Sequence, residues 1–291
     1  MSVTNNRDFI IKKGDELKHA VSNKAASRSD FYDPKNVIFV HGFTSHGEYM
    51  NELVETFYSY DYNCFIFNYN SYRGITEAAA SLHDRLVDIN QLDDGVLEKH
   101  PCILVCHSMG GLVGRALSKL SNANKYISKI IALGTPHKGT LNDATILHAF
   151  ISWGESISSV MPGWTMKDCK SALELVGADN NKTISGLLEG TLESSCIPIL
   201  SVSGGMSKLE IGKNPVYNFI LNYRLRKSLG KGRNDGLVRE DSADVTQLDF
   251  RGLVPDTHHI NDYPDYNEIN HTYLTYNQSV ALKVMKWIED K

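Results

Sequence analysis

The chain has 291 residues, of which 42% are hydrophobic and 22% are charged. This length and composition suffice for one large domain with a substantial buried core. The formal net charge of −4 argues against nucleic acid as the main partner. No apolar stretch approaches the roughly 20 residues that a membrane-spanning helix requires.

The N-terminus and the cysteines bear on where the protein resides. Residues 1–13 are polar, with only three apolar residues grouped among them, and do not form a signal peptide. The five cysteines are odd in number, and two of them lie in a predicted buried strand, which indicates reduced thiols rather than a disulfide framework. We therefore expect a cytoplasmic protein.

Apolar runs and segments of helical spacing alternate along the chain. Residues 1–35 form a polar lead-in whose structure the sequence leaves open, either an edge strand or a helix. Strands are predicted over residues 37–40, 63–69, 102–106, 127–133, 197–202 and, more weakly, 245–250; helices are predicted over residues 48–60, 75–89, 112–120 and 280–288. This alternation predicts an α/β fold with a mostly parallel sheet and helices on both faces. Functional groups should then lie at the carboxyl ends of the strands.

The segment Cys102-Ile-Leu-Val-Cys-His-Ser-Met-Gly-Gly111 carries the strongest functional signal. An apolar strand ends in a sharp turn with Ser108 at its apex, and a helical pattern follows. Such a turn lifts the serine hydroxyl above the sheet and directs the N-terminus of the next helix at an oxyanion. Gly110 meets the need for small neighbours, whereas Cys106 stands where the G-x-S-x-G pattern has its first glycine. Ser108 is the candidate nucleophile.

Three further motifs occur in order around this turn. A strand ends in His41-Gly-Phe43, then Gly134-Thr-Pro-His-Lys-Gly139 follows, and Asn234-Asp-Gly-Leu-Val238 precedes Asn270-His-Thr-Tyr-Leu274. With these motifs the chain resembles the α/β-hydrolase superfamily, and within it the bacterial triacylglycerol lipases and related esterases and deacylases. The resemblance implies an α/β-hydrolase domain over residues 36–291 with a catalytic triad in the chain order Ser, Asp, His.

Two segments are too long to be simple connections. Residues 141–196 begin with an apolar helical stripe, and the resemblance implies that they form a helical cap or lid; a packed insert that never moves is the alternative. If the segment caps the site, it lines an acyl pocket, and longer acyl chains should be preferred. The stripe consists of Ile146, Phe150, Trp153, Ile157 and Val160.

The second long segment, residues 204–233, is strongly basic. It carries seven cations opposed only by Glu210, with apolar residues interleaved. An anionic membrane surface or a phosphate-bearing substrate would suit this insertion, so we consider peripheral membrane contact here. A solvated helix face is the simpler interpretation.

A serine nucleophile requires a base, and the base requires an acid that orients it. His271 is the predicted base because the closing helix begins shortly after it; His258 and His259, in a stretch expected to be a loop, are the competitors. Asp235 is the predicted acid, largely because the Asn-Asp-Gly-Leu-Val motif resembles that of the superfamily. Other carboxylates in the same window are Asp241, Asp244, Asp249 and Asp256.

The remaining assignments concern the backbone and the absence of cofactors. The backbone N–H groups of Phe43 and Met109 are expected to form the oxyanion hole, and His41 and His137 to be structural. No cofactor or metal is expected. The acidic stretch before His271 is interpreted as solvated loop charge rather than as a calcium site; it comprises Asp256, Asp262, Asp265 and Glu268.

Together these residues predict a serine hydrolase that cleaves a small-molecule or lipid carboxylic ester through an acyl-serine intermediate. An acyltransferase, a phospholipase or a thioesterase with the same triad is an alternative. A catalytically silent pseudo-hydrolase, which binds a ligand or partner in the same pocket, is an alternative of another class.

Overall fold

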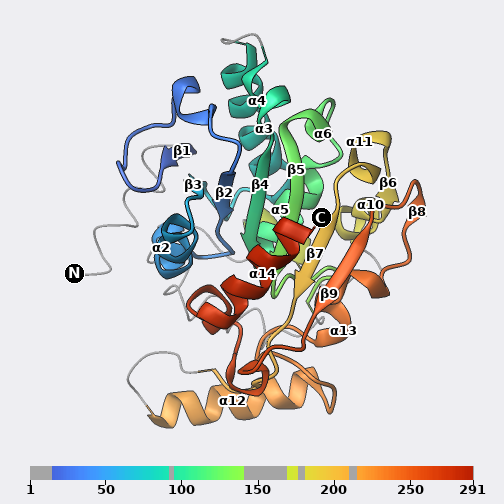
Figure 1. Ribbon diagram of the computed structural model, residues 1–291. Helices are drawn as coiled ribbons and strands as arrows, with labels where there is room; N and C mark the ends of the chain where they lie inside the picture. The colour runs from blue at the N-terminus through green and yellow to red at the C-terminus, as the bar shows by residue number, and fades with distance from the viewer. Residues whose placement is uncertain (1–14, 92–94, 141–168, 176–180, 210–214, 291) are drawn as a thin grey trace.

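A twisted, mostly parallel sheet organises the computed structural model, which describes residues 15–91, 95–140, 169–175, 181–209 and 215–290 (Figure 1). Within these residues the sheet has seven strands in the order β1-β3-β2-β4-β5-β7-β9. Only β1 is antiparallel to its neighbour. The strands are β1 (Glu16–His19), β2 (Asn36–Val40), β3 (Asn63–Asn68), β4 (Cys102–His107), β5 (Ile127–Leu133), β7 (Ile199–Val202) and β9 (Thr257–Ile260).

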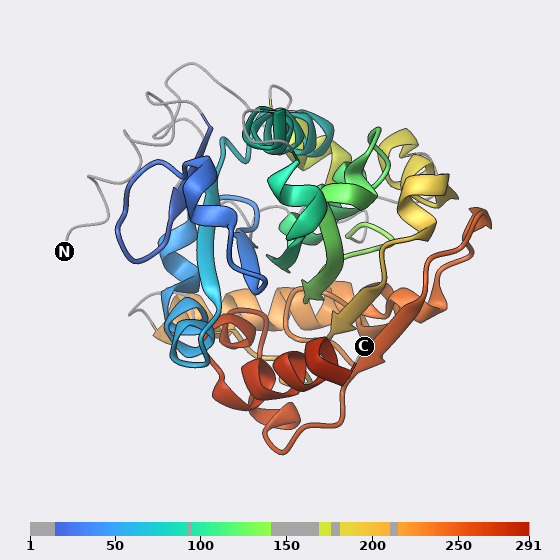
Figure 2. The same ribbon diagram turned by 45° about the horizontal axis from the view of Figure 1, so that its top comes forward.

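Helices cover both faces of the sheet, so the prediction of an α/β fold with a mostly parallel sheet is confirmed. Figure 2 shows α3 on one side and α2 with α14 on the other. The longer helices are α2 (Asn51–Ser59), α3 (Ile75–Gln91), α5 (Met109–Leu117), α12 (Pro215–Leu229) and α14 (Gln278–Asp290). The shorter ones are α4 (Val96–Lys99), α6 (Ala123–Tyr126), α9 (Lys170–Leu175), α10 (Lys182–Leu187), α11 (Leu192–Ser195) and α13 (Glu240–Ala243).

The central strands are buried on both faces because each one is an apolar run. Successive residues of β2 and β4 point alternately into two separate cores. Ile38 and Leu104 pack in the core under α3 and α5, whereas Phe39 and Val105 pack in the core under α2 and α14. This arrangement fixes the end of β4 between two covered layers.

Short elements complete the described fold. A two-stranded sheet pairs β6 (Glu189–Gly190) with β8 (Arg251–Gly252). Single-turn 3₁₀ helices are η1 (Arg28–Phe31), η2 (Gly47–Met50), η5 (Val245–Gln247), η6 (Tyr266–Glu268) and η7 (Tyr273–Thr275). None of the described helices has the length and apolarity needed to cross a membrane.

The predicted strand over residues 245–250 is wrong. Val245–Gln247 is a 3₁₀ helix, and the strand at this edge of the sheet is β9 instead. Its sequence Thr-His-His-Ile is half-buried throughout, so it lacks the apolar run that marks a buried strand. The stretch around His258 and His259 is therefore a strand and not the loop that we expected.

The long segments differ in how much the structure describes. The lead-in contributes β1 as the other edge strand, which settles the question the sequence left open. The apolar stripe from Ile146 to Val160 lies outside the described residues, as does most of the predicted cap. In the basic segment, residues 215–229 form α12, which lies beyond the strand ends at the bottom of Figure 1.

Candidate active site

Ser108 lies at the junction between β4 and α5, in a backbone conformation that few side-chain-bearing residues adopt. Its φ and ψ angles are 55° and −124°. Such a conformation costs on the order of 1–3 kcal/mol and persists only where the surroundings enforce it. Its hydroxyl faces a pocket beyond the carboxyl ends of β2 and β4, as the predicted turn requires.

Close packing at this junction explains the small residues of the motif. A Cβ at Gly110 would collide with the backbone oxygens of Val40 and His41. Cys106, in place of the expected glycine, is fully buried, and its sulfur lies 3.2 Å from where a Cβ at Gly114 would be. A glycine one turn into α5 therefore gives the room that the pattern normally provides at position 106.

The Gly-Thr-Pro-His motif supports the turn from the neighbouring strand. The Ser108 N–H donates to the carbonyl of Leu133 at 2.8 Å, and the Thr135 hydroxyl donates to the carbonyl of Ser108 at 2.8 Å. Both peptide groups that flank Ser108 are thus hydrogen-bonded to β5 and the residues after it. The motif holds the backbone of Ser108 in place.

Asp235 and His271 form a buried hydrogen-bonded pair. The Nδ1–H of His271 donates to Oδ2 of Asp235 at 2.8 Å, and the two side chains are 0% and 1% exposed. The His271 N–H also donates to the Asp235 carbonyl at 2.8 Å, which ties the two loops together. Because Nδ1 carries the proton in this bond, the neutral ring has its lone pair on Nε2.

The Asn-Asp-Gly-Leu-Val motif is a tight turn that orients the Asp235 carboxylate. Oδ1 accepts from the N–H groups of Leu237 at 3.0 Å and Val238 at 2.7 Å. Gly236 has a φ of +95°, a region that favours glycine. Its N–H donates to Oδ1 of Asn234 at 3.0 Å. One carboxylate oxygen is held by the turn, so the other is left for the histidine.

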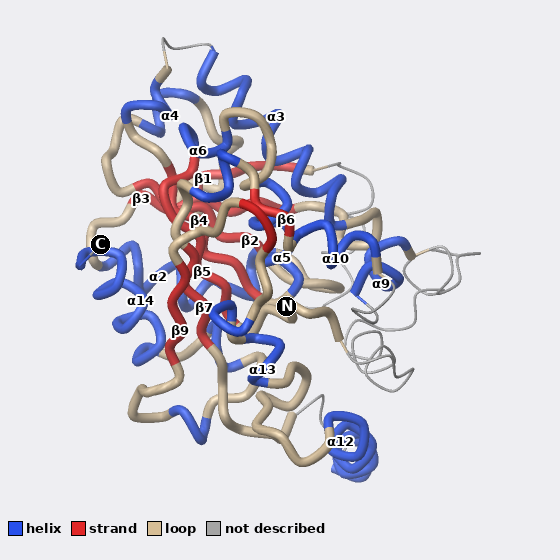
Figure 3. The backbone as a smooth tube through the Cα atoms, turned by 90° about the vertical axis from the view of Figure 1, so that its right-hand side faces the viewer, coloured by secondary structure: helices blue, strands red, loops and turns tan. Residues whose placement is uncertain are grey.

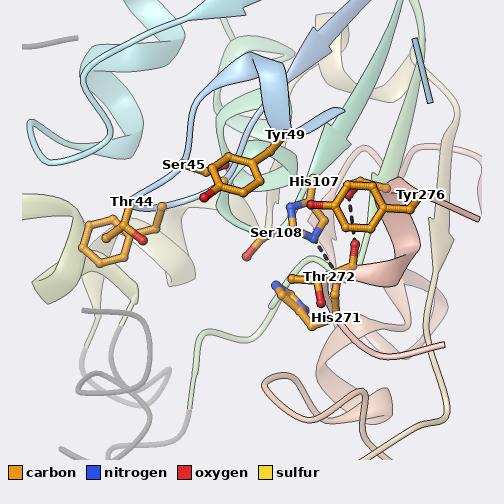
Figure 4. A pocket seen from close by; sticks show the side chains of 11 residues that line it. Thr44, Ser45, Tyr49, His107, Ser108, His271, Thr272 and Tyr276 are labelled. Carbon is orange, nitrogen blue, oxygen red and sulfur yellow. Dashed lines mark hydrogen bonds between the residues drawn. The ribbon is translucent and has the colours of Figure 1, made fainter. Parts of the chain in front are cut away.

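Ser108 and His271 line the same pocket, although they come from different ends of the chain (Figure 4). The rings of Tyr49 and Tyr276 lie on its border. Serine and threonine hydroxyl groups also line it, so the pocket combines aromatic rings with polar groups. Its other lining residues are Gly42, Phe43, Thr44, Ser45, His107, Thr272 and Thr275.

The residues predicted for the oxyanion hole also meet here. Met109 is the first residue of α5, directly after Ser108. Phe43 lines the pocket, and the preceding Gly42 lies so close that a Cβ there would be 2.9 Å from the Cβ of Ser108. The loop after β2 therefore lies against Ser108, on the side from which Phe43 is expected to act.

His41 and His137 are fully buried, as expected for structural residues. His41 donates from Nδ1 to the Gly42 carbonyl at 2.9 Å and accepts from the Tyr69 N–H at 3.3 Å. The N–H of His137 donates to the carbonyl of Ser242 at 2.8 Å. Burial lowers the pKa of His41 to about 3 and the pKa of His137 well below its usual value. Both rings are therefore neutral at ordinary pH.

The competing histidines and carboxylates lie elsewhere. His258 pairs with Asp256 at 3.0 Å, and His259 contacts the Ser201 hydroxyl at 2.8 Å. Neither histidine lines the pocket at Ser108. Asp241 pairs with Arg239 at 2.8 Å, and Asp244 caps η5.

Two further residues lie near the pair, and sequence reasoning assigned no role to one of them, His107. His107 donates from Nε2 to the carbonyl of His271 at 2.8 Å, and burial lowers its pKa to about 3. A Cβ at Gly134 would lie 3.0 Å from both Oδ2 of Asp235 and Nδ1 of His271. The available signal for His107 was its position in the motif, directly before Ser108. Among the described residues, no group of three or more potential ligands could hold a metal ion.

Comparison with known proteins supports this description of the fold. Residues 35–161, less than half of the chain, are similar to the PGAP1-like alpha/beta domain family. The mature lipase BlEst2 of Bacillus licheniformis superposes with a TM-score of 0.58 over 88% of this chain and 92% of its own, at 18% identity. No curated protein is detectably similar to the chain in sequence.

Two further solved structures have the same arrangement. A gene product of Listeria innocua covers 89% of this chain and 95% of its own, with a TM-score of 0.58 and 13% identity. Phospholipase PlaB of Legionella pneumophila has a TM-score of 0.55 and 15% identity over 87% of this chain, which spans 58% of that protein. The fold is that of an α/β hydrolase, and the solved structures that share it include a lipase and a phospholipase.

Proposed function

We propose that this protein is a serine hydrolase that cleaves carboxylic esters, with Ser108 as nucleophile, His271 as base and Asp235 as the acid that orients it. The observation that carries the proposal is the buried 2.8 Å bond that His271, which lines the same pocket as Ser108, donates to Asp235. A backbone turn that constrains the serine and a base with its Nδ1 already hydrogen-bonded are the parts that acyl transfer requires.

The reaction proceeds in two halves. His271 Nε2 removes the hydroxyl proton of Ser108 as the oxygen attacks the ester carbonyl, and the N–H groups of Phe43 and Met109 stabilise the oxyanion. The imidazolium then gives its proton to the leaving alkoxide, and an acyl-serine remains. Water attacks this ester with His271 again as base, which releases the carboxylic acid and restores the serine.

The pocket wall supports an ester with an uncharged acyl group. Tyr49, Tyr276 and Phe43 present aromatic surface, and no acidic or basic side chain other than the two histidines lines the described pocket. Preferred acyl length is part of the proposal: each buried CH₂ contributes about 0.8 kcal/mol until the pocket is full. A p-nitrophenyl ester series from acetate upward measures it.

The decisive experiment is covalent labelling with a fluorophosphonate. Wild-type protein should be labelled at Ser108, and Ser108→Ala should lose both labelling and ester hydrolysis while keeping its circular dichroism spectrum. Ser29→Ala, at an exposed serine, is the matched control and should be labelled like wild type. A label on another serine, or full activity in Ser108→Ala, would contradict the proposal.

A further inference from the structure

Helix α12 exposes apolar side chains on the face that points away from the protein. Leu221, Leu225 and Leu229 are four residues apart and buried, so they form the inner face. On the opposite face, Phe219 is 74% exposed, Tyr223 66% and Ile220 46%. The helix is therefore apolar on two sides, and only one of them is covered by the described residues.

The same outer face is basic. Arg226 follows Phe219 and Tyr223 along one row of the helix, and Arg224 and Lys227 follow Ile220 along the next. These three cations are exposed and form no ion pair within the described part of the chain. From residue 215 to residue 234 the sequence has no acidic residue, although the whole chain has a net charge of −4.

A hollow of about 540 Å³ opens beside this face. Lys208 and Arg226 line it together with the amide groups of Asn218 and Asn222 and the ring of Tyr223. Two cationic side chains next to an aromatic ring suit an anionic group at a polar–apolar boundary.

The helix is also fastened to the loops of the candidate site. Asn222 accepts from the N–H of Leu209 at 2.7 Å and donates to its carbonyl at 2.6 Å. A Cβ at Gly236, next to Asp235, would lie 2.9 Å from Leu209, and Asn270 donates to the carbonyl of Lys208 at 3.1 Å. Figure 3 shows α12 standing apart from the sheet on this side.

We propose that the outer face of α12 is a docking surface for a bilayer that contains anionic phospholipid. Exposed aromatic and aliphatic side chains insert at the headgroup level, and the surrounding cations are attracted to the negative surface. A nucleic acid would match the charge but would leave the aliphatic and aromatic side chains exposed to water. The inference does not depend on the proposed esterase reaction, because binding needs neither Ser108 nor the base.

The test is flotation of the full chain with phosphatidylcholine vesicles with or without about 30 mol% phosphatidylserine. We expect binding only to the anionic vesicles, and its loss at about 0.5 M NaCl, where the Debye length is shorter. Neutralising Arg224, Arg226 and Lys227 to glutamine should weaken binding roughly fivefold per charge. Phe219→Ser with Tyr223→Ser should weaken it about tenfold or more. Ser108→Ala should bind like wild type.

Matched controls carry the same changes elsewhere. Lys24→Gln with Lys286→Gln removes two exposed cations, and Tyr58→Ser with Tyr60→Ser removes two exposed rings. Both control variants should bind vesicles within about twofold of wild type, because only the docked face contacts the membrane. Circular dichroism of each variant excludes misfolding. Equal flotation with both vesicle types, or no flotation, would overturn the proposal. So would a dimer in light scattering that Phe219→Ser with Tyr223→Ser converts to a monomer.

Discussion

The imidazole of His107 donates from Nε2 to the backbone carbonyl of His271 at 2.8 Å, and the two ring centroids lie 4.8 Å apart. The residue immediately before the candidate nucleophile thus holds the loop that carries the candidate base. Because burial keeps His107 neutral, it acts here as a hydrogen-bond donor and not as a charge.

Removing this bond should reduce turnover more than substrate binding. His107→Ala should lower kcat about fivefold to tenfold, the equivalent of one net hydrogen bond, with KM nearly unchanged. His107→Gln keeps an N–H donor and should retain more of the activity. If His107→Ala lowered only the melting temperature and left kcat unchanged, the residue would merely fill space.

The Asp235–His271 pair should behave as a unit with Ser108. Asp235→Asn and His271→Ala should each lower kcat by about 10³-fold to 10⁴-fold, because the wrong tautomer or no base then faces the serine. Adding Asp235→Asn to Ser108→Ala should cost little more. His258→Ala is the matched control at a histidine that pairs with Asp256 and does not line the pocket. A large loss of kcat in His258→Ala would contradict the assignment of His271 as the base.

Gly134 should tolerate no side chain. Its φ of +59° favours glycine, and a Cβ would lie 2.8 Å from Leu274 and 3.0 Å from the two hydrogen-bonded atoms, Oδ2 of Asp235 and Nδ1 of His271. Gly134→Ala should destabilise the fold by about 1–2 kcal/mol and lower kcat as the pair is displaced. Gly186→Ala, where a Cβ meets nothing within 4 Å in helix α10, should be neutral or slightly stabilising. Urea unfolding of both variants measures the contrast.

The buried histidines should make the protein sensitive to acid. Burial lowers the pKa of His41 and His107 to about 3 and that of His137 well below its usual value. Between about pH 3 and 6.5 the unfolded chain binds protons that these native rings do not, so the free energy of unfolding falls as the pH falls. At about pH 5 the rings of His41 and His107 should each cost about 2 kcal/mol relative to neutral pH, and His137 should act in the same direction.

Urea titrations across this pH range test the expectation. The midpoint should drop steeply below about pH 6.5, and the drop should be smaller in His107→Gln, whatever that variant costs at neutral pH. Equal midpoints at about pH 5 and pH 7 would show that the three rings take up protons in the native state.

How far the sequence predicts this structure depends on whether burial is visible in a local pattern. Strands such as β2 and β4 are continuous apolar runs between two covered layers, so they were recognised. The edge strands β1 and β9 read Glu-Leu-Lys-His and Thr-His-His-Ile and are only partly buried, so their pairing is fixed by neighbours and not by their own composition.

The candidate site shows the same limit. Motifs and their order led to Ser108, Asp235 and His271, which the fold brings to one region of the molecule. The bond from His107 to the carbonyl of His271 joins residues 164 positions apart, and no local pattern indicates it. The sequence also does not indicate that Gly114 makes room for the side chain of Cys106. That contact depends on how β4 and α5 pack against each other.

The strained backbone of Ser108 sets stability against activity at a single residue. Its φ of 55° is a conformation that glycine adopts at little cost, whereas any residue with a Cβ pays for it in native stability. Ser108→Gly should therefore unfold at a higher temperature than Ser108→Ala, although both lack the nucleophile. If native stability alone were selected, glycine would be favoured at this position. A serine here therefore indicates a requirement other than stability.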